Sequence, residues 1–137
     1  MKRTASVILL CLCASLFSCG KLTGQFAWKT SGMDAYRQMS DDMEFASDKP
    51  VDWVFAFDGV RGIRYIYVVL QKKELVWVDI KKETVETDKT SPFVHGRIEN
   101  LEPGEYQIVL AEKTKRIADT RFVVYDPEED SADKPEE

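Results

Sequence analysis

Cysteine is almost missing from this chain of 137 residues. Cys11, Cys13 and Cys19 all lie near the N-terminus, so residues 20–137 contain no thiol. A disulfide framework, a cysteine nucleophile and a thiolate metal site are therefore excluded from that stretch. The single histidine, His95, is a lone imidazole in a strand-like segment, and no G-x-S-x-G element accompanies it. We therefore predict no enzymatic activity, no cofactor and no metal site.

Clusters of basic residues are also missing. The formal net charge is −5, and no stripe of lysine or arginine gathers phosphates, which argues against nucleic acid as a partner. Residues 58–62 contain two glycines but lack the spacing of a phosphate-binding loop and a following helix. Negative charge concentrates in residues 126–137, which hold seven acidic residues and one lysine. Such a composition predicts a solvated, disordered tail.

No apolar run is long enough to span a membrane. The longest, residues 5–17, has 13 residues, whereas a spanning helix needs about 20. Lys2 and Arg3 precede it, and small residues follow it. A basic start, a short apolar core and a small-residue end predict a secretory signal peptide over residues 1–18.

The end of that segment reads Leu16-Phe17-Ser18-Cys19-Gly20, which resembles the lipobox of bacterial lipoproteins. The resemblance implies cleavage before Cys19, a diacylglycerol on its sulfur and acylation of its new amino terminus. Phe17 departs from the pattern, because a small residue is usual there; an ordinary signal peptide cut elsewhere is the alternative. Several acyl chains hold a protein stably to a bilayer. We therefore expect a protein anchored by lipid on Cys19 in the cell membrane or outer membrane, facing the periplasm or the cell exterior.

Residues 19–49 have no sustained periodicity. Gln25 to Lys29 fit a short strand, and the spacing of Met33, Tyr36, Met39 and Met43 fits a short amphipathic helix. We predict a lipidated tether that contributes at most an edge strand or a short helix.

From Val51 to Tyr125 the pattern changes to that of β-strands. Residues 81–92 are polar and predict a loop or an exposed edge ribbon. Six strands at intervals of about 8–12 residues predict an antiparallel sandwich or barrel over residues 50–125. The expected strands are 51–57, 63–71, 74–80, 93–98, 105–111 and 117–125.

One motif narrows this choice. Residues 101–106 read Leu-Glu-Pro-Gly-Glu-Tyr, similar to the L-x-P-G-x-Y element of fibronectin type III and other immunoglobulin-like domains. The resemblance implies an all-β immunoglobulin-like sandwich of about seven strands, in which the Tyr106 hydroxyl bonds back to the preceding corner. Ile108 and Leu110 would then follow Tyr106 into the core. A small up-and-down barrel remains the alternative fold.

Aromatic residues occur on both faces of the central strands. If Val76, Val78 and Ile80 face the core, Trp77 faces away, as do Tyr65 and Tyr67 in the strand before. Tyrosine, tryptophan and arginine anchor many interfaces. A partner-binding patch is therefore predicted, unless residues 20–49 fold back and cover it or the faces are reversed. Its residues are Arg64, Tyr65, Tyr67 and Trp77.

Two functions compete. The first is a non-enzymatic protein-binding or scaffolding lipoprotein whose partner is an envelope or surface protein. The second is a carrier that holds an apolar ligand inside a barrel-like body, which requires an internal cavity.

Overall fold

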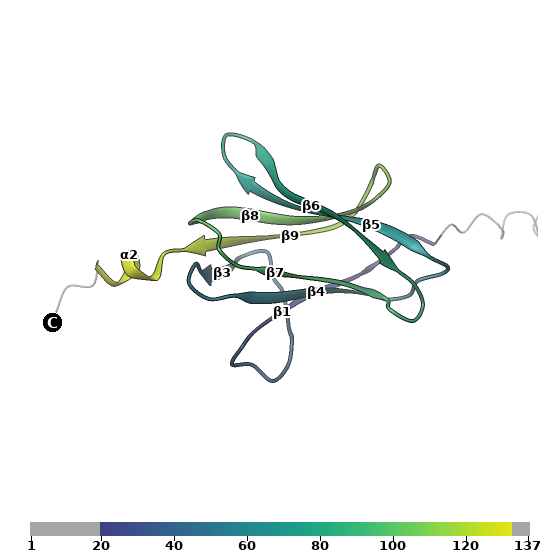
Figure 1. Cartoon of the computed structure of the whole chain (residues 1–137), viewed down its shortest axis with the longest axis horizontal. Coiled ribbons are helices and arrows are strands. Elements are labelled where there is room, and N and C mark those ends of the chain that lie inside the picture. Colours follow the sequence, from purple (N-terminus) through teal and green to yellow (C-terminus); the bar gives the residue numbers. More distant parts are fainter. Residues whose placement is uncertain (1–19, 133–137) are drawn as a thin grey trace, which may run out of the picture.

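Two β-sheets face each other in the computed structural model, which describes residues 20–132 (Figure 1). The described chain forms nine strands and one short helix, α2 (Pro127–Ala132). The strands are β1 (Gly24–Thr30), β2 (Arg37–Gln38), β3 (Met43–Ala46), β4 (Val51–Phe57), β5 (Arg64–Lys73), β6 (Trp77–Thr87), β7 (Phe93–Ile98), β8 (Gly104–Glu112) and β9 (Lys115–Tyr125).

The strand order is β2-β1-β4-β7 in one sheet and β3-β9-β8-β5-β6 in the other. All neighbours are antiparallel except β3, which pairs with β9 in parallel. Two separate sheets make a sandwich rather than an up-and-down barrel, so the predicted sandwich is confirmed. Seven strands are long; β2 and β3 are short additions to the predicted number.

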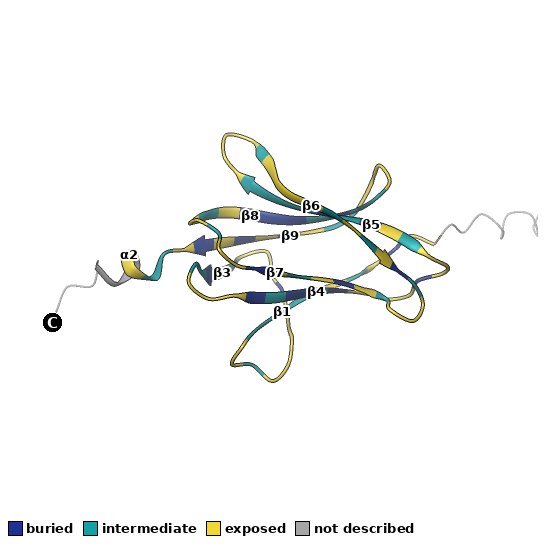
Figure 2. Ribbon diagram, viewed as in Figure 1, coloured by how far each residue is buried: buried dark blue, intermediate teal, exposed yellow. Residues whose placement is uncertain are grey.

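Alternation along each strand builds the core. In β4, Val51, Trp53, Phe55 and Phe57 are buried while the residues between them are not. Period-2 alternation sends these four side chains to one face, toward the opposite sheet. Figure 2 shows buried positions in strands of both sheets. The sequence prediction for residues 51–57 matches β4 residue for residue.

The corner before β8 has the geometry that the L-x-P-G-x-Y resemblance implied. The Tyr106 hydroxyl donates a 2.6 Å hydrogen bond to the main-chain carbonyl of Glu102. Tyr106, Ile108 and Leu110 are buried, and Leu101 packs against the core. The predicted tyrosine corner is therefore confirmed.

Residues 20–49 contribute more than the expected tether. β1 pairs along its whole length with β4, and β3 borders β9. Leu22, Phe26 and Phe45 belong to the core. The expected helix through Met33 and Met43 does not form; Met39 is instead buried, and Met43 opens β3. Contacts with residues far along the chain decide that residues 20–49 join the sandwich. Leu22 and Phe26, for example, have apolar neighbours only in the folded domain.

The β5–β6 hairpin corrects two predictions. β6 continues to Thr87, so most of the polar segment expected to be a loop is an edge strand. Val76, Val78 and Ile80 do not face the core; each is about half exposed or more. A β-bulge between Leu70 and Gln71 shifts the register, and beyond it the hairpin leaves the sandwich at the upper left of Figure 1. Among residues 20–132, no strand of the opposing sheet covers the inward side of this hairpin, which leaves Val76, Val78 and Ile80 exposed.

The structure describes part of the predicted C-terminal tail but not the predicted signal peptide. Residues 127–132, expected within a disordered tail, form the short helix α2. The signal peptide and Cys19 lie outside the described residues. Within residues 20–132, no helix has the length and apolar character to cross a membrane.

Candidate functional site

The predicted aromatic patch lies on the outer face of the five-stranded sheet, the surface turned away from the other sheet. In β5, Ile66 and Val68 are buried toward the core, so Tyr65 and Tyr67 point outward by alternation. Tyr65 is 57% exposed, and Tyr67 is half-buried. Trp77 lies on the same face. Its register partner is Lys73, which is an even number of residues after Tyr65 and Tyr67 in β5 and so points to the same side. We call Tyr65, Tyr67 and Trp77 the aromatic face.

Cationic side chains lie over the rings of Tyr67 and Trp77. Lys73 Nζ lies 5.1 Å from the centroid of the Trp77 ring, and the Arg121 guanidinium carbon lies 5.7 Å from it. Lys82 Nζ is 5.3 Å from the centroid of Tyr67. Cation–π contacts of this kind restrict ring orientation and place positive charge beside an apolar surface. The orientations of the Tyr67 and Trp77 rings are therefore restricted.

A hydrogen-bonded amide chain crosses the centre of the outer face. The side chain of Gln107 in β8 donates to Gln71 in β5, which donates to Asp79 in β6 at 2.6 Å. Gln107 is only 3% exposed, and its Oε1 has no hydrogen-bond partner among the described residues. Sequence reasoning missed these residues, because polar residues in a strand normally indicate solvent-facing positions.

Two open hollows border this polar centre. One, of about 440 Å³, is lined by Tyr67, Val69, Lys82 and the β8–β9 turn. The other, of about 290 Å³, is lined by Trp77 and Arg121 and by acidic residues. Those acidic residues are Asp41, Asp42, Glu44 and Glu105. The outer face therefore offers an aromatic ring with cationic neighbours at each hollow, a composition suited to contact with a polar protein surface.

The structure separates Arg64 from the aromatic face. Arg64 lies two residues before the inward-facing Ile66 and pairs in register with the buried Thr87. Its guanidinium makes a 2.8 Å ion pair with Glu112 and a second contact to the Arg61 carbonyl. Its inclusion in the patch was wrong because neighbouring residues of a strand point to opposite faces.

Residues 20–49 do not cover the aromatic face. β1 and β2 belong to the four-stranded sheet, and β3 lies at the edge beside β9. Tyr65, Tyr67 and Trp77 point away from the core, and Tyr67 and Trp77 are half-buried by their own neighbours. That these residues bind a partner stays a prediction.

His95 lies on the outer side of the other sheet. It is exposed in β7, and its ring centroid is 6.1 Å from that of Phe93. Among residues 20–132 no group of three or more histidine, aspartate or glutamate side chains is arranged to hold a metal ion.

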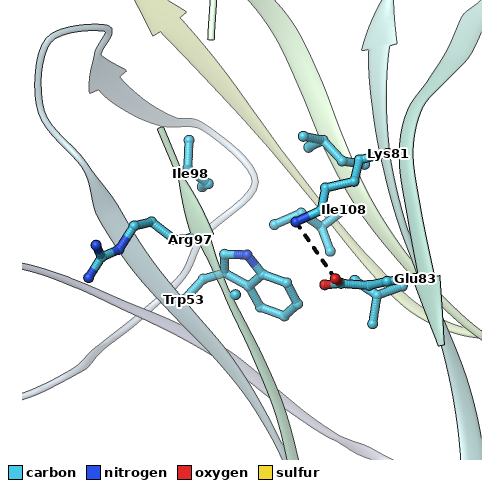
Figure 3. A pocket seen from close by; sticks show the side chains of 9 residues that line it. Trp53, Lys81, Glu83, Arg97, Ile98 and Ile108 are labelled. Carbon is cyan, nitrogen blue, oxygen red and sulfur yellow. Dashed lines mark ion pairs between the residues drawn. The ribbon is translucent and has the colours of Figure 1, made fainter. Parts of the chain in front are cut away.

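A narrow cavity opens between the sheets beside β6 (Figure 3). It is lined by Trp53, Ile98 and Ile108, and the ion pair of Lys81 with Glu83, 3.6 Å long, stands at its edge. Its volume is about 30 Å³, which is room for about one water molecule. An apolar ligand does not fit there, so this cavity does not supply what the carrier hypothesis requires.

Comparison with known proteins adds information on the fold. The soluble domain of PmoD from a Methylocystis species superposes with a TM-score of 0.51 at 10% identity, covering 77% of this chain and 94% of that domain. An immunoglobulin-like protein (PA1606) from Pseudomonas aeruginosa superposes with a TM-score of 0.49 at 11% identity, covering 77% of this chain and 95% of that one. The chain has an immunoglobulin-like fold. No protein-family profile matches this immunoglobulin-like chain, and no curated protein matches it in sequence.

Proposed function

We propose that this protein is a lipid-anchored, non-enzymatic binding module of the bacterial cell envelope, and that it contacts a partner protein through the aromatic face. The observation that carries the proposal is the placement of Tyr65, Tyr67 and Trp77 together on the uncovered side of the five-stranded sheet. A sheet in a sandwich needs only one apolar face for its core, so aromatic residues on the other face require a separate explanation.

The surroundings of these rings favour a protein partner. Tyrosine and tryptophan bury large areas while fixing few rotatable bonds, which is why they anchor interfaces. Here Lys82 and Arg121 already orient two of the rings, so little side-chain freedom is lost on binding. At the centre of the face, the half-buried Gln71 amide and the exposed Asp79 carboxylate offer hydrogen bonds to a partner backbone.

The anchor is the second part of the proposal, and the lipobox resemblance around Cys19 supports it. A lipid on Cys19 would hold the domain at the cell membrane or the outer membrane and present the aromatic face to an envelope or surface protein. Replacing Cys19 with Ala should release the protein from the membrane fraction of the cell. A Cys19→Ala protein that still sediments with membranes, in the amount seen for the native protein, contradicts the anchor.

Cross-linking in intact cells, followed by identification of the captured protein, tests the binding face. We expect Tyr67→Ala and Trp77→Ala each to reduce capture of the main partner at least tenfold while the melting temperature changes little. Such a loss is typical of an aromatic anchor worth about 2 kcal/mol. Phe93→Ala is the matched control, since Phe93 is an exposed aromatic residue on the opposite sheet.

Unchanged capture by both face variants would refute this binding surface without touching the anchor. Equal loss in Phe93→Ala would show that the effect is not specific to the face.

A further inference from the structure

The two ends of the sandwich carry opposite charge. The chain enters at one end, where Gly24 pairs with Phe57 and the Thr23 hydroxyl donates to Asp58. Residues 20–24, 57–65, 86–93 and 111–116 form this end, on the right of Figure 1. They include seven basic and four acidic residues, and Asp119, just beyond them, pairs with Arg116, so the net charge of this end is +2. We call it the basic end; its cations are Lys21, Arg61, Arg64, Lys89, Lys113, Lys115 and Arg116.

The opposite end is acidic. Residues 29–52, 71–82, 97–106 and 121–132 hold nine basic and fifteen acidic residues, a net charge of −6. The domain therefore has a charge asymmetry along its long axis, although residues 20–125 as a whole are close to neutral.

Several cations of the basic end have no counter-charge. Lys21, Arg61 and Lys89 are exposed, and none of them makes an ion pair within residues 20–132. Two carboxylates lie near them: Asp58 accepts from Thr23, and Asp88 accepts from Thr90 and Ser91. Because the cations outnumber these carboxylates, the field of this end still favours an external anion.

The same end is hollowed. An open hollow of about 780 Å³ has an apolar floor and a basic rim. The buried Leu22, Phe57 and Val60 contribute the floor. Lys21, Arg61 and Lys89 line the hollow as exposed cations, together with one carboxylate, Asp58. Ile63, next to the hollow in sequence, is 60% exposed. An apolar floor below a ring of cations matches a phospholipid headgroup, which joins an anionic phosphate to acyl chains.

We infer that the basic end rests on the anionic phospholipid headgroups of the bilayer that carries the anchor. This inference depends on the proposed lipid at Cys19. Leu22 is fixed in the core, so only Gly20 and Lys21 separate it from Cys19. Three residue steps span at most about 11 Å, which is too short for the domain to turn its other end to the membrane.

The orientation assigns directions to the remaining surfaces. The acidic end and the exposed tip of the β5–β6 hairpin point away from the bilayer. The aromatic face lies on the side of the domain and stays open to a partner in the same membrane layer. The lipid thus attaches the domain to the bilayer, and the electrostatic contact sets its orientation there.

The test uses the lipidated protein reconstituted in phosphatidylcholine vesicles with or without phosphatidylglycerol, with a nitroxide quencher on the lipid headgroups. Gly59→Cys and Gly32→Cys give matched fluorophore sites, because a Cβ atom at either position meets no atom within 4 Å. Gly59 lies in the hollow and Gly32 at the acidic end. We expect quenching at Gly59 to be severalfold stronger than at Gly32 in vesicles with phosphatidylglycerol. Raising the salt to about 1 M, where the Debye length is about 3 Å, should weaken it.

Charge variants isolate the cause. Combining Lys21→Gln, Arg61→Gln and Lys89→Gln should lower quenching at Gly59 to its value in vesicles without phosphatidylglycerol. The control combines Arg37→Gln, Lys49→Gln and Lys81→Gln, which removes the same charge from the acidic end and should leave the quenching unchanged. Each lysine or arginine at an anionic surface contributes about fivefold to membrane affinity, so three changes are readily detected.

The outcomes separate the two proposals. Equal quenching at both sites, or quenching unaffected by the first variant, overturns the inference while the protein stays on the vesicles. If Cys19 carries no lipid, two separate measurements reveal it. The native protein would then accept a thiol label at Cys19, and it would not remain with the vesicles at high salt.

Discussion

The indole ring of Trp53 occupies the space in which Gly96 lacks a side chain. The two residues are register partners in β4 and β7, and both face the core. A Cβ atom added at Gly96 would lie 2.8 Å from Nε1 of Trp53 and 2.9 Å from two of its ring carbons. Trp53 is 4% exposed, so its ring has little room to move away.

Gly96→Ala should therefore destabilise the domain. Overpacking of a filled core costs about 1–3 kcal/mol, since the ring or the strand must shift. Urea unfolding followed by tryptophan fluorescence measures the change. Gly32→Ala is the control, because a methyl group there meets no atom within 4 Å. Equal stability of the two variants would show that the Trp53 ring is not confined by β7.

The tyrosine corner predicts a defined pH dependence. Burial raises the pKa of the Tyr106 phenol, so the folded state holds its proton more tightly than the unfolded state. The stabilisation is complete below the ordinary tyrosine pKa of about 10 and is lost as the pH rises through the higher folded value. Tyr106→Phe should lower the free energy of unfolding by about 1 kcal/mol at neutral pH through loss of the bond to Glu102.

At alkaline pH the difference between Tyr106→Phe and the native protein should shrink, because phenylalanine cannot ionise. Denaturant unfolding at neutral and alkaline pH provides the comparison. Tyr65→Phe is the control, since Tyr65 is 57% exposed and should change the stability by less than about 0.5 kcal/mol. A pH-independent difference for Tyr106→Phe would contradict the explanation.

The tip of the β5–β6 hairpin should tolerate polar substitution. Leu75 is 98% exposed, so Leu75→Ser should change the free energy of unfolding by less than about 0.5 kcal/mol. Leu110 has the same side chain with no exposure, and Leu110→Ala should cost about 2–5 kcal/mol. Thermal and urea unfolding of the pair distinguish these values. A large loss in Leu75→Ser would mean that the tip is covered in the folded protein.

The β6–β7 turn should weaken in acid. Hydrogen bonds from the Thr90 hydroxyl and from the Ser91 and Thr90 amides lower the pKa of Asp88. Its stabilising effect is therefore present above the ordinary aspartate pKa of about 3.9 and is lost as the pH falls through the lower folded value. The protection factors of the Thr90 and Ser91 amides, which compare their hydrogen exchange with that of an unstructured chain at the same pH, should fall as the pH drops through this range. In Asp88→Asn this fall should be absent; its persistence would assign it to another group.

Sequence alone identified most of the sandwich because alternation is a local property. The boundaries of β4 and β7 matched the expected strands, and the L-x-P-G-x-Y motif placed the Tyr106 corner before any fold was known. The candidate face was partly predictable for the same reason: the period of two puts Tyr65 and Tyr67 on one side of a strand.

Only the tertiary structure decided whether each face of a strand is covered by another layer or exposed to solvent. Val78 and Ile80 alternate as core residues do, yet the bulge carries their hairpin beyond the opposing sheet and leaves them exposed. Gln107 looks like a surface residue in the sequence but is buried in the middle strand of its face. The spacing of residues along a strand determines which side chains share a side. Whether another layer covers that side depends on strand order and bending, which arise from contacts between distant residues.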